Sequence, residues 1–150
     1  MRVCTLVIIN DGERVLLGMK KRGFGQGRWN GFGGKVEPDE TIDEAAAREL
    51  REEAGLIPVG LRKAGTFEFL FDDDTEDTQV HLFCASSFMG EPGETEEMRP
   101  QWFPHSEIPF KDMWPDDEYW FPHFLAGNFF HGTFRFKDTD TLLEHDIRVL

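Results

Sequence analysis

A run of carboxylates inside a strongly signalled helix, residues 41–55, constrains this chain more than any other feature. Thr41 followed three residues later by Glu44 is the pairing that caps a helix N-terminus, and Gly55 provides the left-handed residue at which many helices end. A helix turns by roughly 100° per residue, so three of its glutamates share one face. They are Glu49, Glu52 and Glu53. The segment therefore predicts a helix with a concentrated acidic patch.

This acidic patch requires a compensating positive charge, because like charges at neighbouring helix positions are destabilising by about 0.2–0.5 kcal/mol per pair. One source is a hard divalent cation, which prefers carboxylate oxygens as ligands. The other source is the pair Arg48 and Arg51, which would form salt bridges with the glutamates on a solvated face of the helix. The helix by itself favours neither alternative.

A glycine-rich loop precedes the helix. Residues 23–34 contain six glycines in twelve positions, interleaved with Phe24, Trp29, Asn30 and Phe32. A flexible linker would carry serines rather than rings. We therefore expect a loop whose backbone approaches another group closely.

The rest of the chain predicts strands on both sides of this loop and helix. They lie at 3–9, 14–19, 67–71, 80–85, 99–103, 129–136 and 142–149, with a second helix at 118–126. Asn10-Asp11-Gly12 predicts a tight turn between the first two strands. This order favours an α/β fold in which helices cover a mixed sheet, with a single domain over residues 1–150.

The spacing between loop and helix resembles a known family signature. Five residues separate Gly34 from Glu40, and seven more separate Glu40 from Arg48, which begins the string Arg-Glu-Leu-Arg-Glu-Glu-Ala-Gly-Leu. This pattern resembles the signature of the Nudix hydrolases. The resemblance implies an α/β/α sandwich with a mixed β-sheet and a loop-helix-loop catalytic motif. It also implies Mg²⁺ as the cofactor, with Mn²⁺ as a substitute.

The same resemblance implies roles for the acidic residues. The metal site would consist of Gly33, Glu49, Glu52, Glu53 and Glu97, and the three helix glutamates would also be catalytic. A divalent ion screens phosphate charge and lowers the pKa of a bound water. Glu52 or Glu53 would take the proton of that water. Arg48 would orient the glutamates rather than touch the substrate.

Three further segments, 14–25, 27–36 and 109–117, resemble Nudix members that act on oxidised purine nucleoside triphosphates. This implies hydrolysis of 8-oxo-dGTP and 2-hydroxy-dATP to the monophosphate and pyrophosphate, which sanitises the nucleotide pool and prevents mutagenic misincorporation. One alternative is a Nudix hydrolase of another nucleoside diphosphate compound or of a methylated purine triphosphate. Another is a binding protein that has kept the scaffold without catalysis, although the intact glutamates argue against it.

Asp116 and Asp117 are the candidates for reading the base. Oxidation at C8 of guanine leaves a proton on N7, so an acceptor becomes a donor that a carboxylate can bind. Two adjacent carboxylates in an apolar pocket do not both ionise, so one would keep its proton and donate. The alternative is that they cap the helix at 118–126. The resemblance favours base recognition, with further substrate contacts from Thr5, Lys20, Phe24, Asn30, Phe32, Gly33, Gly34, Phe69 and Trp114.

The charge of the chain limits its partners. A formal net charge of −13, from 29 acidic against 16 basic residues, repels nucleic acid polymers. We therefore expect a small nucleotide as the partner, no membrane association and a monomer. Cys4 and Cys84 lie in apolar runs and are expected to be buried, reduced thiols. The expected location is cytoplasmic, with nuclear and mitochondrial fractions.

Overall fold

The computed structural model describes the whole chain, residues 1–150. The strands are β1 (Arg2–Asn10), β2 (Arg14–Lys20), β3 (Trp29–Asn30), β4 (Ile57–Val59), β5 (Arg62–Phe71), β6 (Thr78–Ala85), β7 (Ser87–Met89), β8 (Met98–Pro104), β9 (Phe130–Asp138) and β10 (Thr141–Val149). The helices are α1 (Ile42–Ala54) and α2 (Asp117–Leu125), and two 3₁₀ turns are η1 (His105–Glu107) and η2 (Phe110–Asp112).

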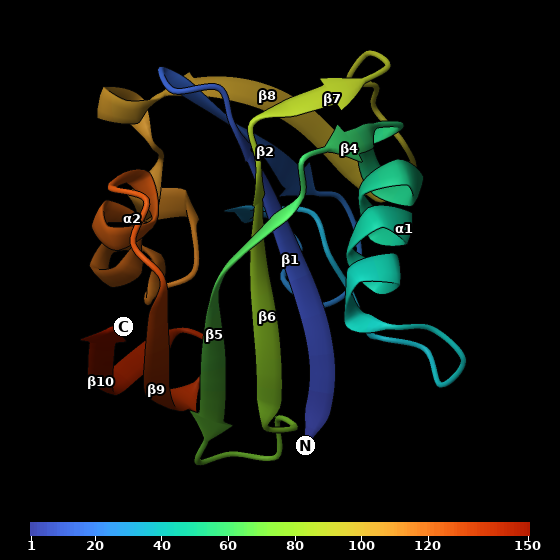
Figure 1. The fold of residues 1–150 in the computed structure, drawn as a ribbon. Helices are drawn as coiled ribbons and strands as arrows, with labels where there is room; N and C mark the ends of the chain where they lie inside the picture. Colours follow the sequence, from blue (N-terminus) through green and yellow to red (C-terminus); the bar gives the residue numbers. More distant parts are fainter.

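Eight strands form one mixed sheet (Figure 1). Its order is β10-β9-β5-β6-β1-β2-β3, and β8 pairs with β2. The β1–β6 and β5–β9 pairs are parallel, and the others are antiparallel. Strands β4 and β7 form a separate two-stranded sheet. The predicted mixed-sheet α/β class is confirmed.

Strand β1 shows why helices cover both faces of the sheet. Val7 and Ile9 are fully buried in one hydrophobic cluster with Leu50 of α1, whereas Ile8 is buried in the other cluster with Trp120 of α2. Successive side chains of a strand point to opposite faces, so an unbroken apolar run is typical of a strand covered on both. Figure 1 shows α1 and α2 on opposite sides of the strands, which confirms the sandwich.

Helix α1 begins and ends where the sequence predicts. The Thr41 hydroxyl accepts from the Glu44 amide, and the Glu44 carboxylate accepts from the Thr41 amide. Gly55 ends the helix with φ of 73°, and its amide donates to the carbonyl of Arg51. Leu50 is fully buried against the sheet. This contact sets the rotation of α1 about its axis and therefore the direction of its glutamates.

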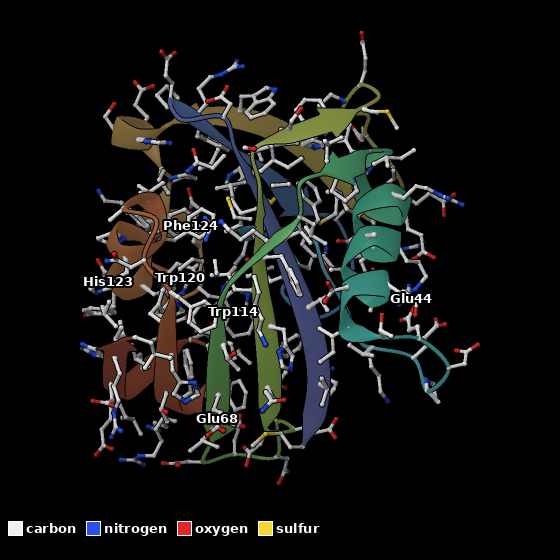
Figure 2. The ribbon with its side chains drawn as sticks, viewed as in Figure 1. Glu44, Glu68, Trp114, Trp120, His123 and Phe124 are labelled. Carbon is white, nitrogen blue, oxygen red and sulfur yellow. The ribbon has the colours of Figure 1, made fainter.

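Helix α2 packs through an aromatic face. Trp120 and Phe124 face the sheet and are buried, whereas His123 lies on the other side of the helix (Figure 2). The helix begins at Asp117, one residue before the predicted start, so this carboxyl belongs to the first turn. Neither helix is long and apolar enough to cross a membrane.

The predicted strands differ from the observed ones mainly in their extent. β5 begins at Arg62 rather than Phe67, because pairing with β6 extends it. β1 and β2 pair only next to their turn, at Ile9–Leu16 and Asn10–Val15, since β2 continues along β8. The short strands β3, β4 and β7 were not predicted, because two or three residues carry no periodic pattern.

Candidate functional site

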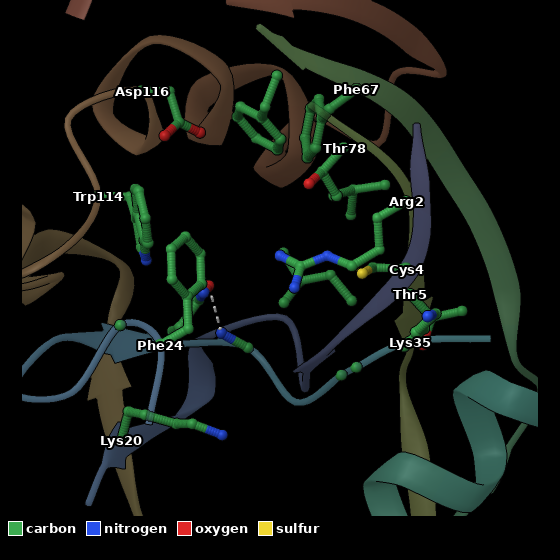
Figure 3. Close-up of a pocket in the computed structure, with 18 of the residues that line it drawn as sticks. Arg2, Cys4, Thr5, Lys20, Phe24, Lys35, Phe67, Thr78, Trp114 and Asp116 are labelled. Carbon is green, nitrogen blue, oxygen red and sulfur yellow. Dashed lines mark hydrogen bonds between the residues drawn. The ribbon is translucent and has the colours of Figure 1, made fainter. Parts of the chain in front are cut away.

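The structure contains a cavity of about 300 Å³ (Figure 3). Strands β1, β3, β5 and β6, helix α2, the loop before β3 and the segment after β3 supply most of its lining. Asp116 and Lys20 lie at different ends of the close-up, with Phe24 and Trp114 between them. The volume is at the lower end of the range for small-molecule sites, so the cavity suits a compact ring system.

Asp116 and Asp117 occupy one end of this cavity and are 2% and 3% exposed. The indole Nε1 of Trp120 donates to Asp116 Oδ2 at 2.9 Å. Asp116 Oδ1 and Asp117 Oδ2 have no hydrogen-bond partner in the protein. Asp117 is an acid of the first turn of α2, as the alternative expects, and Asp116 stands at the N-cap position but makes no side-chain capping hydrogen bond, so capping does not occupy its carboxyl. Its carboxyl is available to a ligand instead.

Burial controls the protonation of this pair. Desolvation raises the pKa of Asp116 above its ordinary 3.8. Desolvation raises the pKa of Asp117 well above the same value, and the charge of Asp116 adds to the shift. The Arg28 guanidinium opposes both pKa shifts. Burial and the repulsion between the two carboxylates therefore both favour a protonated carboxyl in this pair, which would give it a donor as well as acceptors.

Aromatic rings form the walls next to the aspartates. The ring centroids of Trp114 and Phe24 lie 5.2 Å apart (Figure 3). Phe69 of β5 also lines the cavity and stacks on Phe134 with centroids 5.5 Å apart. Such rings provide flat apolar surface against which a base can stack.

Asn30 and Thr5 add polar groups to the lining. Asn30 Oδ1 already accepts from the Gly31 amide at 2.8 Å, so the side-chain NH₂ is left to donate. Thr5 is 2% exposed, and its hydroxyl has no partner in the protein. Buried polar atoms in folded proteins nearly always have a partner, so this hydroxyl has bonding capacity left for a ligand.

Gly33 and Gly34 bring the glycine-rich loop against β1 and α1. A Cβ at Gly33 would lie 1.8 Å from the Thr5 carbonyl oxygen, a distance that excludes any side chain. The Gly33 amide donates to Glu53 Oε1 at 2.8 Å. A Cβ at Gly34 would lie 2.6 Å from Glu49 Oε1. The glycine pattern of the loop predicted a close backbone approach. The structure shows that the loop backbone approaches the glutamates of α1.

Glu53 is the helix glutamate that reaches the cavity. It is 4% exposed, and desolvation raises its pKa to about 7, opposed by Lys20 and the Gly33 amide. Lys20 Nζ lies 3.6 Å from Glu53 Oε2 and 3.4 Å from Glu97 Oε2. A carboxyl with a pKa near neutrality is suited to accept or release a proton.

Arg48 of α1 is a second cation beside the glutamates, in addition to Lys20 of β2. It donates to Glu49 at 2.9 Å, to Glu52 at 3.2 Å and twice to Glu40, at 2.9 and 2.6 Å. These bonds hold the pKa of Glu40 down to about 2, whereas burial raises the pKa of Glu49. Arg51 forms no ion pair with these glutamates. Arg48 therefore binds Glu40, Glu49 and Glu52 together, and Glu40 also accepts from the Glu37 amide.

Glu49 and Glu53 fit a hard divalent cation in their chemistry. Both supply oxygen ligands, and burial raises the pKa of each, so added positive charge beside them is stabilising. No three carboxylate, imidazole or thiol side chains are gathered closely enough to hold a metal ion. Lys20 and Arg48 instead draw the glutamates toward two separate positive charges.

The predicted site residues outside the cavity lining are Phe32, Glu49, Glu52 and Glu97. The side chain of Phe32 is fully buried in the cluster beneath α1, between two cavity-lining glycines, Gly31 and Gly33, so its place around the nucleotide stays a prediction. Glu52 has a 57% exposed side chain bound by Arg48. Glu97 lies beside the cavity through its contacts with Lys20 and with Arg22, at 3.4 and 2.7 Å.

Cys4, Arg2 and Trp120 line the cavity although sequence reasoning did not place them there. Both cysteines are free thiols, but Cys4 is only half-buried, which corrects the expectation for it. Trp120 follows Asp116 by four residues, and this helical spacing could have predicted their contact. Arg2 has its guanidinium carbon 5.4 Å from the Phe24 centroid. No pattern in the sequence indicates that position.

The fold and the site together define the class of this protein. A mixed sheet lies between two helices, and a glycine-rich loop holds an acidic helix beside a cavity of ligand size. The NUDIX domain model matches residues 1–124. The chain belongs to the Nudix family, whose hydrolases generally use divalent metal ions.

Similar proteins match nearly the whole chain. It is 54% identical over 147 residues to the oxidized purine nucleoside triphosphate hydrolase of Mus musculus, covering 98% of this chain and 94% of the relative. It is 52% identical over 146 residues to the protein of the same name from Danio rerio, covering 97% and 94%. A crystal structure of a MutT protein from Bacillus halodurans superimposes with a TM-score of 0.88 at 28% identity, covering 98% and 97%.

Proposed function

We propose that this protein hydrolyses oxidised purine (deoxy)nucleoside triphosphates, 8-oxo-dGTP and 2-hydroxy-dATP, to the monophosphate and pyrophosphate. The observation that carries this proposal is the buried Asp116–Asp117 pair at the end of an aromatic cavity. The similarity to two relatives named for oxidized purine nucleoside triphosphates supports it. Removal of such nucleotides prevents mutagenic misincorporation.

The aspartate pair would read the edge of the base. Oxidised guanine carries a proton on N7, where guanine has an acceptor. The ionised carboxyl of the pair accepts from that proton, and the protonated carboxyl donates to a neighbouring carbonyl. Asn30 donates through its free NH₂ group. Because the proton can reside on Asp116 or Asp117, the pair suits more than one oxidised purine.

The walls and the other end of the cavity would hold the remainder of the nucleotide. Trp114, Phe24 and Phe69 stack on the purine, an interaction worth about 1–3 kcal/mol per base. Lys20, 23% exposed in its side chain, lies where a cation can meet phosphate oxygens. The unpartnered Thr5 hydroxyl is a further hydrogen-bonding group for the nucleotide.

The reaction is assigned to the end of the cavity at α1. Glu49, Glu52 and Glu53 are its carboxylates, with Gly33 and Glu97 beside them. Mg²⁺, or Mn²⁺ as a substitute, would supply charge screening for the phosphates and a water of lowered pKa when bound there. Glu53 would take the proton of the attacking water, because it is the glutamate of α1 that lines the cavity. The Gly33 amide holds its carboxylate in place.

We further propose that residues 1–150 act as one domain and as a monomer, since the aspartates, the aromatic walls and Glu53 of the cavity all belong to one fold. A monomer of this kind needs no partner residue to complete its site. Free nucleotides occur in the cytoplasm, nuclei and mitochondria, and these are the proposed locations of the activity.

Pyrophosphate release by the purified protein tests the proposal. The assay compares 8-oxo-dGTP and 2-hydroxy-dATP with dGTP, dATP and ADP-ribose, in magnesium, in manganese and after chelation with EDTA. We expect preference for the oxidised purines and loss of turnover in EDTA. Preferred cleavage of another compound would contradict the substrate assignment, and no cleavage in either metal would leave a nucleotide-binding protein.

A further inference from the structure

Arg28 reaches Trp114 from the loop before β3. Its guanidinium carbon lies 4.4 Å from the centroid of the Trp114 ring. A guanidinium over an indole is attracted by the negative face of the ring. It also occupies that face, so a planar base can stack only on the other one.

The turn between β9 and β10 holds Arg28 in this position. Nη1 donates to the Thr139 carbonyl at 2.8 Å, and Nη2 donates to Asp140 Oδ1 at 2.6 Å. The Arg28 side chain is 21% exposed, whereas that of Asp140 is 80% exposed. Two directed bonds from one planar guanidinium fix its orientation, which a single point charge would not do.

The same C-terminal hairpin contacts Trp114 a second time. Phe136 of β9 meets the indole edge-on, with centroids 6.2 Å apart and an interplanar angle of 90°. Phe136 also lies 6.0 Å from Phe69, another wall of the cavity. The hairpin lies beyond residue 124, where the match to the family domain ends. Residues beyond the segment matched by the family model therefore reach the base end of the cavity.

We infer that Arg28 is a positioning residue for base stacking, anchored by Thr139 and Asp140 so that it fixes the plane of Trp114. The indole then presents a single, pre-oriented face to the purine. Arg28 acts through the ring and need not touch the nucleotide. The inference rests on the proposed function, because it concerns the base of that substrate.

Steady-state kinetics with 8-oxo-dGTP test this role. Arg28→Met should raise KM about fivefold to tenfold, the range expected when a cation–π contact is lost, and leave kcat within about twofold. The split would arise because the proposed reaction takes place at the other end of the cavity, at α1. Arg28→Lys keeps the charge but not the forked donor. Its KM should therefore lie between that of the unaltered protein and that of Arg28→Met. Asp140→Asn should raise KM about twofold to threefold, because the hydrogen bond from Arg28 Nη2 to residue 140 loses its charge and holds the guanidinium less firmly.

Arg148→Met is the matched control, because Arg148 is a 75% exposed arginine of β10 that pairs only with Asp146. Its KM should equal that of the unaltered protein. An unchanged KM in Arg28→Met, or an equal rise in Arg148→Met, overturns the inference. If Arg28→Met fails to fold by circular dichroism, Arg28→Lys and Asp140→Asn decide in the same way. An unaltered protein that does not cleave 8-oxo-dGTP overturns the proposed function, and this inference with it, before any variant is compared.

Discussion

Glu53 at one end of the cavity lies 3.6 Å from the Lys20 ammonium group, whereas Asp116 and Asp117 at the other end form no ion pair. Both groups are buried: Glu53 is 4% exposed, and the aspartates are 2% and 3% exposed. A buried carboxylate must be compensated, either by a cation or by a proton. At the α1 end Lys20 and Arg48 lie beside the glutamates, whereas at the base end no cation pairs with the aspartates and desolvation favours their protonated form.

This difference matches the chemistry proposed at each end. Positive charge beside Glu53 and Glu49 can be exchanged for another cation, which suits a site that handles phosphates. A proton shared by Asp116 and Asp117 can move between two oxygens without charge entering or leaving, which suits recognition of base edges. Four substitutions test this comparison, taken from the largest expected effect to the smallest.

Glu53→Gln should cause the largest change, because it removes the proton acceptor and one negative charge from the α1 end. We expect turnover of 8-oxo-dGTP to fall about 10²–10⁴-fold, the usual contribution of a general base. Nucleotide affinity, measured by calorimetry, should change little, since the base end is untouched. Glu107→Gln, at an exposed position of η1, is the control and should keep full turnover. Near-normal turnover in Glu53→Gln would refute its assignment.

Asp116→Ala should weaken base selection. The ratio of kcat/KM for 8-oxo-dGTP over dGTP should fall about tenfold to a hundredfold, because a good contact to a base edge discriminates by about 1–3 kcal/mol. A ratio equal to that of the unaltered protein would contradict the proposal that Asp116 and Asp117 recognise the base.

The control for base selection is Trp114→Ala, which removes stacking from both purines. It should lower kcat/KM for both nucleotides by similar factors and leave their ratio unchanged. If the ratio fell as far as in Asp116→Ala, selection would reside in the ring rather than in the carboxyls.

Asp117→Asn should stabilise the free protein at neutral pH. Burial raises the pKa of Asp117 above 3.8, so the folded state retains a proton that the unfolded state loses as the pH rises. The stabilising contribution of this carboxyl is complete below pH 3.8 and is lost as the pH rises toward the folded pKa. We therefore expect the variant to gain roughly 1–3 kcal/mol at pH 7.5, comparable to removing an unsatisfied buried group.

The advantage of Asp117→Asn should shrink as the pH is lowered toward 3.8, below which both states of the unaltered protein carry the proton. Urea unfolding at a series of pH values measures it. A gain that does not depend on pH would show that protonation is not what compensates the pair.

Arg48→Met should have the smallest effect. Its side chain is 25% exposed and those of its partners are 12–57% exposed, and ion pairs that stay in contact with solvent contribute only about 0–1 kcal/mol. We expect a loss of stability of that order in metal-free buffer, and a smaller loss in magnesium, because a divalent ion takes over the compensation of Glu49. An equal loss in both buffers would argue against cation exchange at the α1 end.

The sequence predicted the α1 end in detail because its determinants are local. The Thr41–Glu44 cap and the Gly55 stop depend on residues within one helix, where separation along the chain sets the geometry. The loop glycines were also predicted to permit close approach, and the contact of Gly33 with Glu53 agrees with this.

Other parts of the site were less accessible to sequence reasoning. Phe32 and Phe69 are the same residue type near the same site, yet Phe32 is fully buried beneath α1 and Phe69 lines the cavity. Glu52 and Glu53 are neighbours, yet one side chain is exposed and the other buried. These outcomes depend on which distant segments cover each side chain, and periodicity within one element does not specify them.

The sequence by itself determined the acidic helix, the close-approach loop, the mixed sheet and the pair of adjacent aspartates. Only the tertiary structure decided how each carboxylate is neutralised, which ring faces the cavity, and that Arg28 is held on Trp114 by a turn more than a hundred residues later. The physical reason is that helix and turn signals act over a few residues. Desolvation and ion pairing depend on groups that meet only when the chain is folded.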